Sequence, residues 1–426
     1  MYQIENSSQV LKARGRLVSR LFAPGVSRTV VLLGLTSLFT DISAEMVSTI
    51  LPLYLLFSLN LSPAVFGVVD GLYQGAAALV RVFGGVAADR SGRHKEVAVL
   101  GYALSALARL GLLVVGSGWT LLAGVVMVDR LGKGIRTAPR DAMITLSSRA
   151  EDLGTAFGVH RALDTAGAML GPLMAFGLLT IAPDAYDAVF VVSLCAALIG
   201  LGILTLFVQN QPVPAPPEAP RPALTLAAAS RLVRVPGMAP LLLVGTALSL
   251  ATMSDGFLYL TLQRRAAFEP RFFPLLYVAT ALIFMLLAVP VGRLADRWGR
   301  GRVFLAGHAL LLAVYGSLLV PWSATLHVAA ALVLLGAYYA ATDGVLMALA
   351  GAVLPRDLVA SGLALLTTGT SLARLAGSIG FGALWAWRGV GVAVVTTTIA
   401  LAAALIMTAV TLRPGKEPRD VQHPVP

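Results

Sequence analysis

The stretch GGVAADRSGR, residues 84–93, is matched by a second stretch, VGRLADRWGR, residues 291–300. Both follow the pattern G-x-x-x-D-R-x-G-R, and both come directly after an apolar segment. The two copies occupy corresponding places in the first and second halves of the chain. The sequence therefore predicts two related halves, each with a charged turn after its second apolar segment.

The composition of the chain indicates whether it lies in water or in a membrane. Of its 426 residues, 57% are hydrophobic and only 12% are charged, and the mean hydropathy is +0.82. A soluble globular protein has about 45–50% apolar and about 25% charged residues. The composition excludes that class and indicates that most of the chain lies in a membrane.

Apolar runs of about 20 residues, each long enough to cross a bilayer as a helix, recur along the whole chain. We predict an all-α integral membrane protein with twelve transmembrane helices in two pseudo-symmetric six-helix bundles. The predicted spans are 29–57, 64–87, 97–116, 119–146, 154–182, 187–208, 238–263, 272–294, 303–320, 325–352, 359–385 and 389–412.

A proline-rich segment, QNQPVPAPPEAPRPA at 209–223, separates the two halves, because proline at this density favours an extended chain without a core. The predicted organisation is a basic N-terminal segment, a six-helix bundle, a cytoplasmic linker, a second six-helix bundle and a tail. Their predicted ranges are 1–28, 29–208, 209–237, 238–412 and 413–426.

The net charge of +11 fits a membrane protein without any nucleic-acid partner, since lysine and arginine gather in cytoplasmic loops. Basic residues cluster before the first span, between spans two and three, in the middle loop, between spans eight and nine and after the last span. This pattern predicts that both termini are cytoplasmic. One predicted outer loop breaks the pattern with Arg264, Arg265 and Arg271.

The fourth span carries an unusual charged stretch, DRLGKGIRTAPRDAM at 129–143. Asp129, Lys133, Arg136 and Arg140 fall on one helical stripe, and Arg130 lies roughly 16 Å into the membrane at 1.5 Å per residue. Charge facing lipid is costly, so we expect the stretch to line a water-filled, inward-opening cleft. The alternative is an internal ladder of salt bridges, with Asp129 bound to Lys133 and Asp141 bound to an arginine.

Other ionisable residues lie inside predicted spans, where they are functional candidates by default. Span one holds Asp41 and Glu45, one turn apart, and we expect a role in proton coupling or substrate binding unless they only form ion pairs. Span five holds a second group: His160, Arg161 and Asp164. The candidates in the second half are Asp255, Asp343 and Arg374.

Catalytic and metal chemistry find little support in the sequence. The single cysteine, Cys195, excludes a cysteine metal cluster, and no nucleophile–base pair or metal-ligand set is evident. We therefore expect no enzyme activity, no metal and no cofactor.

These motifs resemble the major facilitator superfamily over the whole chain. The doubled G-x-x-x-D-R-x-G-R motif is the best-known motif of that superfamily, and the resemblance implies state-dependent gating contacts, although the motif could also serve only to fix topology. The implied gating residues are Gly85, Asp89, Arg90, Gly92 and Arg93, and in the second half Gly292, Asp296, Arg297, Gly299 and Arg300.

Two further motifs of the superfamily are present in part. Arg130-Leu-Gly-Lys-Gly134 resembles its R-x-x-Q-G motif, with Lys133 in place of the glutamine, which implies that Arg130 acts in substrate or proton coupling. Gly158, Gly167 and Gly171-Pro172 resemble its antiporter motif, although Ala175 and Phe176 replace two trailing glycines. This resemblance favours export by exchange.

The sequence therefore predicts a secondary transporter of the bacterial inner membrane that acts as a monomer and uses the proton gradient. We expect a proton-coupled antiporter that exports a small anionic, zwitterionic or amphipathic organic solute by alternating access. The alternative is an importer or facilitator of an organic anion or a metal complex. A receptor without transport explains neither the midplane charges nor the doubled motif.

The gating hypothesis makes a prediction about Asp89. The change Asp89→Asn should impair transport and leave membrane insertion intact, because it removes one charge from a state-dependent contact. Asp296→Asn should have a milder effect if the first copy of the motif dominates. Normal transport by the Asp89→Asn protein would contradict a gating role.

Overall fold

The computed structural model describes residues 26–116, 118–149, 152–210, 232–320, 324–343, 345–354 and 359–411. The described residues form helices and turns and contain no strand. They divide into two compact units, one of residues 1–223 with 269–278, the other of residues 224–268 with 279–426.

The first unit contains six long helices. They are α2 (Arg28–Leu53, continued by a π-helical turn at Tyr54–Ser58), α3 (Pro63–Ser91), α4 (His94–Val114), α5 (Trp119–Leu146), α6 (Leu153–Ile181) and α7 (Tyr186–Phe207). Their ends follow from local chemistry. Ser27 and Ser62 accept backbone N–H groups at the starts of α2 and α3. Gly92, with φ +63°, ends α3 in a left-handed conformation.

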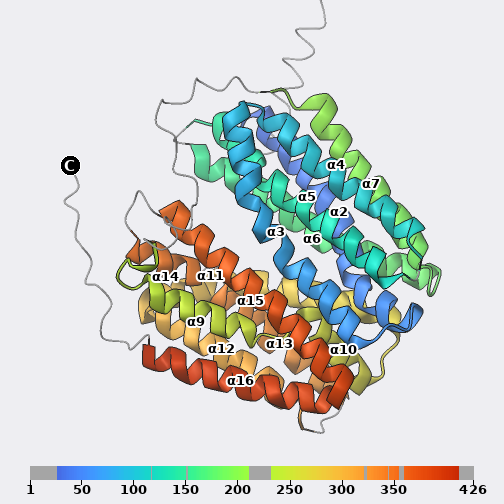
Figure 1. Cartoon of the computed structure of the whole chain (residues 1–426), viewed down its shortest axis with the longest axis vertical. Helices are drawn as coiled ribbons and strands as arrows, with labels where there is room; N and C mark the ends of the chain where they lie inside the picture. Colours follow the sequence, from blue (N-terminus) through green and yellow to red (C-terminus); the bar gives the residue numbers. More distant parts are fainter. Residues whose placement is uncertain are drawn as a thin grey trace, which may run out of the picture. The chain divides into compact units, whose positions relative to one another are not determined.

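Helix α2 packs along α6 and α7, while α4 packs on α5 and α7, and α3 packs on α5 (Figure 1). Buried apolar side chains fill the space between these helices, among them Val30, Leu33, Tyr102, Met143 and Leu204. The first unit is therefore a closely packed bundle in which α2 and α5 contact several neighbours each.

The second unit contains α9 (Met238–Leu250), α10 (Asp255–Ala266), α11 (Phe273–Trp298), α12 (Arg300–Ser317), α13 (Ala324–Thr342), α14 (Val345–Val353), α15 (Val359–Arg388) and α16 (Val390–Thr411). Helix α12 packs on α13 and α16, and α15 packs on α9 and α16. The first residues of α11, up to Val278, and a short 3-10 turn at Pro270–Phe272 group with the first unit.

Two of the predicted spans, 238–263 and 325–352, each hold two helices of the structure. Residues 251–254 separate α9 from α10, while α13 ends at Thr342 and α14 begins at Val345. The first break ends at Ser254, whose side chain accepts the N–H of Phe257 and so begins a new helix. The predicted span at 238–263 is confirmed as an apolar segment, Met238–Ala266, that is long enough to cross a membrane, and the break within it was not predicted.

The two copies of the charged motif are mostly helical, which differs from the predicted loops. Helix α3 continues to Ser91 and α11 to Trp298, so the reversals are confined to the glycines at the ends, Gly92 and Gly299. Gly299 has φ +96°, a value that glycine adopts easily.

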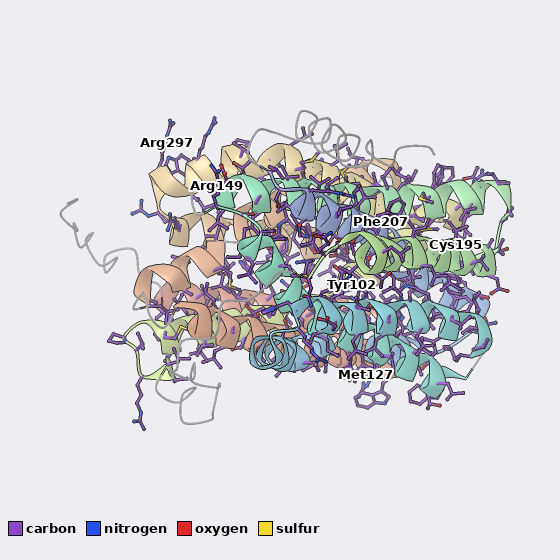
Figure 2. The ribbon with its side chains drawn as sticks, turned by 90° about the horizontal axis from the view of Figure 1, so that it is seen from above. Tyr102, Met127, Arg149, Cys195, Phe207 and Arg297 are labelled. Carbon is purple, nitrogen blue, oxygen red and sulfur yellow. The ribbon has the colours of Figure 1, made fainter. Side chains whose placement is uncertain are left out.

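The outer surface of the helices is apolar. Phe207, Leu206 and Ile181 are 54%, 77% and 84% exposed, and Cys195 on α7 is exposed as well; Figure 2 labels Phe207 and Cys195. Eight segments of the described residues are long and apolar enough to cross a membrane. The described residues thus have the helical, apolar character expected of an all-α membrane protein.

Candidate functional site

The close crossing of α4 and α5 positions the charged stretch. A Cβ added to Gly132 would lie 2.5 Å from the backbone oxygen of Gly101, and one added to Gly101 would lie 2.7 Å from the Cβ of Arg136. The two backbones can approach this closely only because both positions are glycine. Side chains next to these glycines on α4 and α5 are consequently brought into direct contact.

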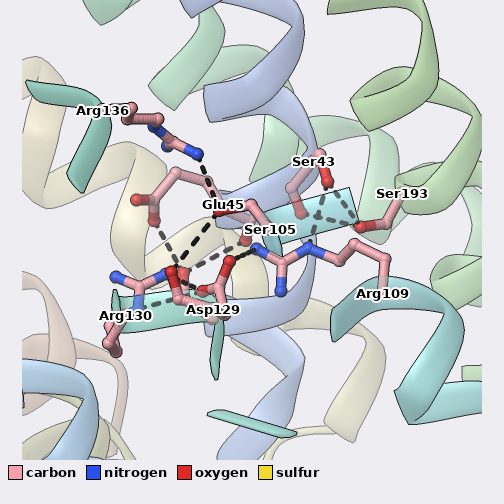
Figure 3. A network of polar contacts seen from close by, with 9 residues as sticks. Ser43, Glu45, Ser105, Arg109, Asp129, Arg130, Arg136 and Ser193 are labelled. Carbon is pink, nitrogen blue, oxygen red and sulfur yellow. Dashed lines mark hydrogen bonds and ion pairs between the residues drawn. The ribbon is translucent and has the colours of Figure 1, made fainter. Parts of the chain in front are cut away.

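Asp129 is the centre of a buried ionic cluster. Its Oδ1 lies 3.1 Å from Nη2 of Arg109 on α4, and its Oδ2 accepts hydrogen bonds from Nε and Nη2 of Arg130. The side chains of all three residues are about 4% exposed. One carboxylate thus holds two guanidinium groups from two helices (Figure 3).

Arg109 also reaches a third helix. Its Nε donates to Ser43 Oγ on α2 at 3.1 Å, and Ser193 on α7 donates to the backbone oxygen of Ser43 at 2.9 Å. Arg109 was not among the residues singled out in the sequence. An arginine within the apolar run ALARLGLLVV meets the rule for intramembrane charge and could have been found by it.

Arg130 and Arg136 in the charged stretch also have aromatic or hydroxyl partners. The guanidinium of Arg130 lies 3.7 Å from the ring centre of Tyr73. That of Arg136 lies 4.5 Å from the ring centre of Tyr102 and donates to Ser105 Oγ at 2.8 Å. Arginine stacks well on aromatic faces, so these contacts stabilise the buried charges.

The prediction that the whole stripe lines a water-filled cleft is therefore wrong for this conformation. Asp129, Arg130 and Arg136 are 3–5% exposed, while Lys133, Arg140 and Asp141 are half-buried. The ladder alternative was closer, although Asp129 binds Arg109 and Arg130 instead of Lys133. Helical spacing correctly predicted that the charged residues of this stretch share one face of α5. It could not show that other helices cover that face.

A second cluster joins α2 to α6. The carboxyl groups of Asp41 and Asp164 lie within interaction range of each other, and Lys133 lies within electrostatic range of Asp41. Nη1 of Arg140 lies 3.9 Å from Asp164, and its Nη2 lies 2.9 Å from Asp141. Two carboxyl groups that approach each other can form a hydrogen bond only when one of them carries a proton.

The remaining first-unit candidates surround these clusters. Glu45 accepts a hydrogen bond from Ser48 at 2.7 Å and lies within electrostatic range of Arg130. His160 contacts Ser37 Oγ at 3.0 Å through Nε2. Arg161 is 81% exposed and lies 3.9 Å from Asp164. Arg130 thus lies within electrostatic range of Glu45, but its direct partner is Asp129.

The glycines of the antiporter-like motif differ in their surroundings. A Cβ at Gly167 would lie 2.4 Å from the backbone oxygen of Leu38, and one at Gly171 would lie 2.8 Å from the backbone oxygen of Ile42. At Gly158 such a Cβ would meet nothing within 4 Å. Gly167 and Gly171 therefore allow α6 to lie against α2, next to the Asp41–Asp164 pair, and Pro172 follows within α6.

The second unit holds its own polar group. The hydroxyl of Tyr339 on α13 donates to Asp255 Oδ1 at the start of α10. Arg374 on α15 lies within electrostatic range of Tyr338, Tyr339, Asp255 and Asp343. The side chains of Arg374 and Asp343 are exposed. The structure thus groups the three second-half candidates within one unit.

The predicted gating residues are described only in part. Arg93, Arg297 and Arg300 are exposed, and Figure 2 shows Arg297 pointing away from the helices. Gly292 has open space around its Cα. The side-chain positions of Gly85, Asp89, Arg90 and Asp296 lie outside the described residues.

Comparisons with known proteins agree with this architecture. An uncharacterised MFS-type transporter of Methanocaldococcus jannaschii is 29% identical over 374 residues, which cover 84% of this chain and 89% of that protein. An uncharacterised protein of Mycobacterium tuberculosis is 34% identical over 179 residues, 42% of this chain and 41% of that protein.

Solved structures show the same fold at low identity. The nucleoside transporter NupG matches with a TM-score of 0.74 and 15% identity, over 90% of this chain and 99% of that one. An auto-inhibited POT family peptide transporter matches with a TM-score of 0.76 and 13% identity, over 94% and 99%. Residues 33–269 and 253–425 match the Major Facilitator Superfamily. The chain therefore belongs to the major facilitator superfamily and is a transmembrane transporter.

Proposed function

We propose that this transporter is a proton-coupled antiporter that exports a small anionic, zwitterionic or amphipathic organic solute. The observation that carries the proposal is the pair of neighbouring carboxyl groups, Asp41 on α2 and Asp164 on α6, in two helices that pack on each other. Half-buried carboxyl groups inside a membrane are suited to take up and release a proton. The glycine contacts of α6 on α2 and the resemblance to the antiporter motif support exchange.

The charges around the pair favour one solute class within this proposal. When the pair gains a second proton, Lys133 and Arg140 lose an anionic neighbour and attract an anion more strongly. A purely anionic solute would then travel together with the proton, which is the importer alternative. Exchange against protons therefore fits a zwitterionic or amphipathic solute better than a simple anion.

We propose further that the protein works as a monomer in the bacterial cytoplasmic membrane, with both termini in the cytoplasm and the proton gradient as its energy source. The distribution of basic residues along the sequence supports this orientation. No cofactor is part of the proposal.

A vesicle experiment tests the proton coupling. Inverted membrane vesicles are made acidic inside, and a fluorescent amine reports the pH gradient while amino acids, succinate or ethidium are added in turn. A solute that is exchanged for protons should dissipate the gradient. Asp41→Asn and Asp164→Asn should abolish this response, because neither variant retains the pair of carboxyl groups that holds the proton.

The matched control is Asp187→Asn, an exposed carboxylate in the first turn of α7, which should behave like the parent protein. Proton movement in the same direction as the solute would contradict antiport and establish the alternative. Full coupled exchange by both Asp41→Asn and Asp164→Asn would remove the carboxyl pair from the mechanism.

A further inference from the structure

Arg374 is a cation with an exposed side chain in the predicted span 359–385. It lies near the middle of α15, a helix of 30 residues, and its neighbours on that helix are mostly apolar or small. Among the described residues, no carboxylate is within ion-pair distance of it. A guanidinium does not lose its proton in proteins and is costly in hydrocarbon. Its position therefore indicates contact with water or with a charged solute.

Asp255 carries the opposite charge near Arg374, and contacts that do not involve Arg374 hold it in place. Ser254 begins α10 and fixes Asp255 in its first turn, while the Tyr339 hydroxyl donates to its carboxylate. The preceding break is stabilised as well, because the N–H of Met253 donates to the Tyr315 hydroxyl at 2.6 Å.

The two charges attract each other but are not joined in an ion pair. Asp255 belongs to α10 and Arg374 to α15, and ring contacts of Phe257 with Phe381 and Trp385, at 4.7 and 5.6 Å, set the spacing of these helices. Two fixed charges of opposite sign, separated from each other, complement a molecule that carries both signs.

We infer that Arg374 and Asp255 bind the carboxylate and the ammonium group of a small zwitterionic solute of the α-amino acid type. This inference goes beyond proton-coupled export and rests on it only for the movement of the solute. A simple anion would bind Arg374 but be repelled by Asp255. A simple cation would bind Asp255 but be repelled by Arg374. The helix start alone explains an acidic residue at Asp255, but it does not explain Arg374.

Equilibrium binding to the full chain in detergent, without a pH gradient, tests the inference. Thermal stabilisation is measured with each protein amino acid. The best one is then compared with its decarboxylated amine and its deaminated acid, which for leucine are isopentylamine and isocaproate. The amino acid should bind about tenfold tighter than either relative, because each lacks one charge-assisted contact.

The variants assign the two contacts. Arg374→Gln should remove the advantage over the amine, and Asp255→Asn should remove the advantage over the acid, while Asp343→Asn should change neither. Arg388→Gln, at the end of the same helix and stacked on Trp387, is the matched control. Arg374→Lys keeps the charge and should keep part of the preference, and the unliganded melting temperature of each variant reports its folding.

Failure to bind any amino acid, or binding of the deaminated acid as tightly as the parent, would overturn the inference. An exporter of a lipophilic solute would fail this binding test and still dissipate a pH gradient in vesicles. The failure of the inference and the failure of the proposed function are thus distinguishable.

Discussion

Replacing Asp129 by asparagine is expected to destabilise the first unit by about 3–5 kcal/mol, the usual result of removing one partner from a buried ion pair. Asp129 is the shared carboxylate of Arg109 and Arg130, and the three side chains are about 4% exposed. The neutral amide leaves two buried guanidinium groups without the carboxylate that they share. Equilibrium unfolding of the detergent-solubilised protein measures the loss.

The control for this prediction is Asp141→Asn on the same helix. Asp141 also binds an arginine, at 2.9 Å, but its side chain is 42% exposed. Exposed pairs contribute about 0–1 kcal/mol, so this variant should unfold almost like the parent. Adding Arg109→Gln to Asp129→Asn should restore part of the lost stability, because only one unpaired cation remains. If Asp129→Asn and Asp141→Asn lowered the free energy of unfolding equally, burial could not be the cause of the effect.

A similarly large effect is expected for Gly167→Val. The nearest atom to a Cβ at this position is the backbone oxygen of Leu38, at 2.4 Å, so the contact cannot be relieved by a side-chain rotation. Overpacking costs about 1–3 kcal/mol where side chains can adjust, and a backbone clash should reach or exceed the upper value. We expect a lower melting temperature and loss of transport, because α6 must move away from α2.

Gly158→Val is the matched control, since it makes the same chemical change in the same helix and the same motif. A Cβ there meets nothing within 4 Å, and both variants replace glycine within a helix. Gly158→Val should therefore fold and transport like the parent. Comparable destabilisation by the two variants would show that helix propensity, and not the contact with α2, explains the loss.

The helices could largely be predicted from the sequence because length and apolar composition dominate in a membrane. The predicted span 119–146 has the same limits as α5, and 64–87 lies within α3. The break before α10 was missed because its residues, ATMS, are also compatible with a helix. Ser254 followed by Asp255 is a typical helix start and marks the place in retrospect.

The partners of the charged residues were much harder to predict. Helical spacing places Asp129 and Arg136 on one face, but it cannot say that Arg109 on α4 lies opposite Asp129. That pairing depends on how far α4 is shifted along α5, which the contact between Gly101 and Gly132 determines. Such a contact between residues far apart in the chain leaves no periodic pattern in either segment.

The cluster around Asp129 has a mechanical consequence. Through Arg109, Ser43, Arg130 and Tyr73 it ties α4 and α5 to α2 and α3. Sliding any of these helices along its axis would separate buried charges before new contacts could form. The four helices are thus joined to one another, and we expect a conformational change of the transporter to move them together as one rigid group.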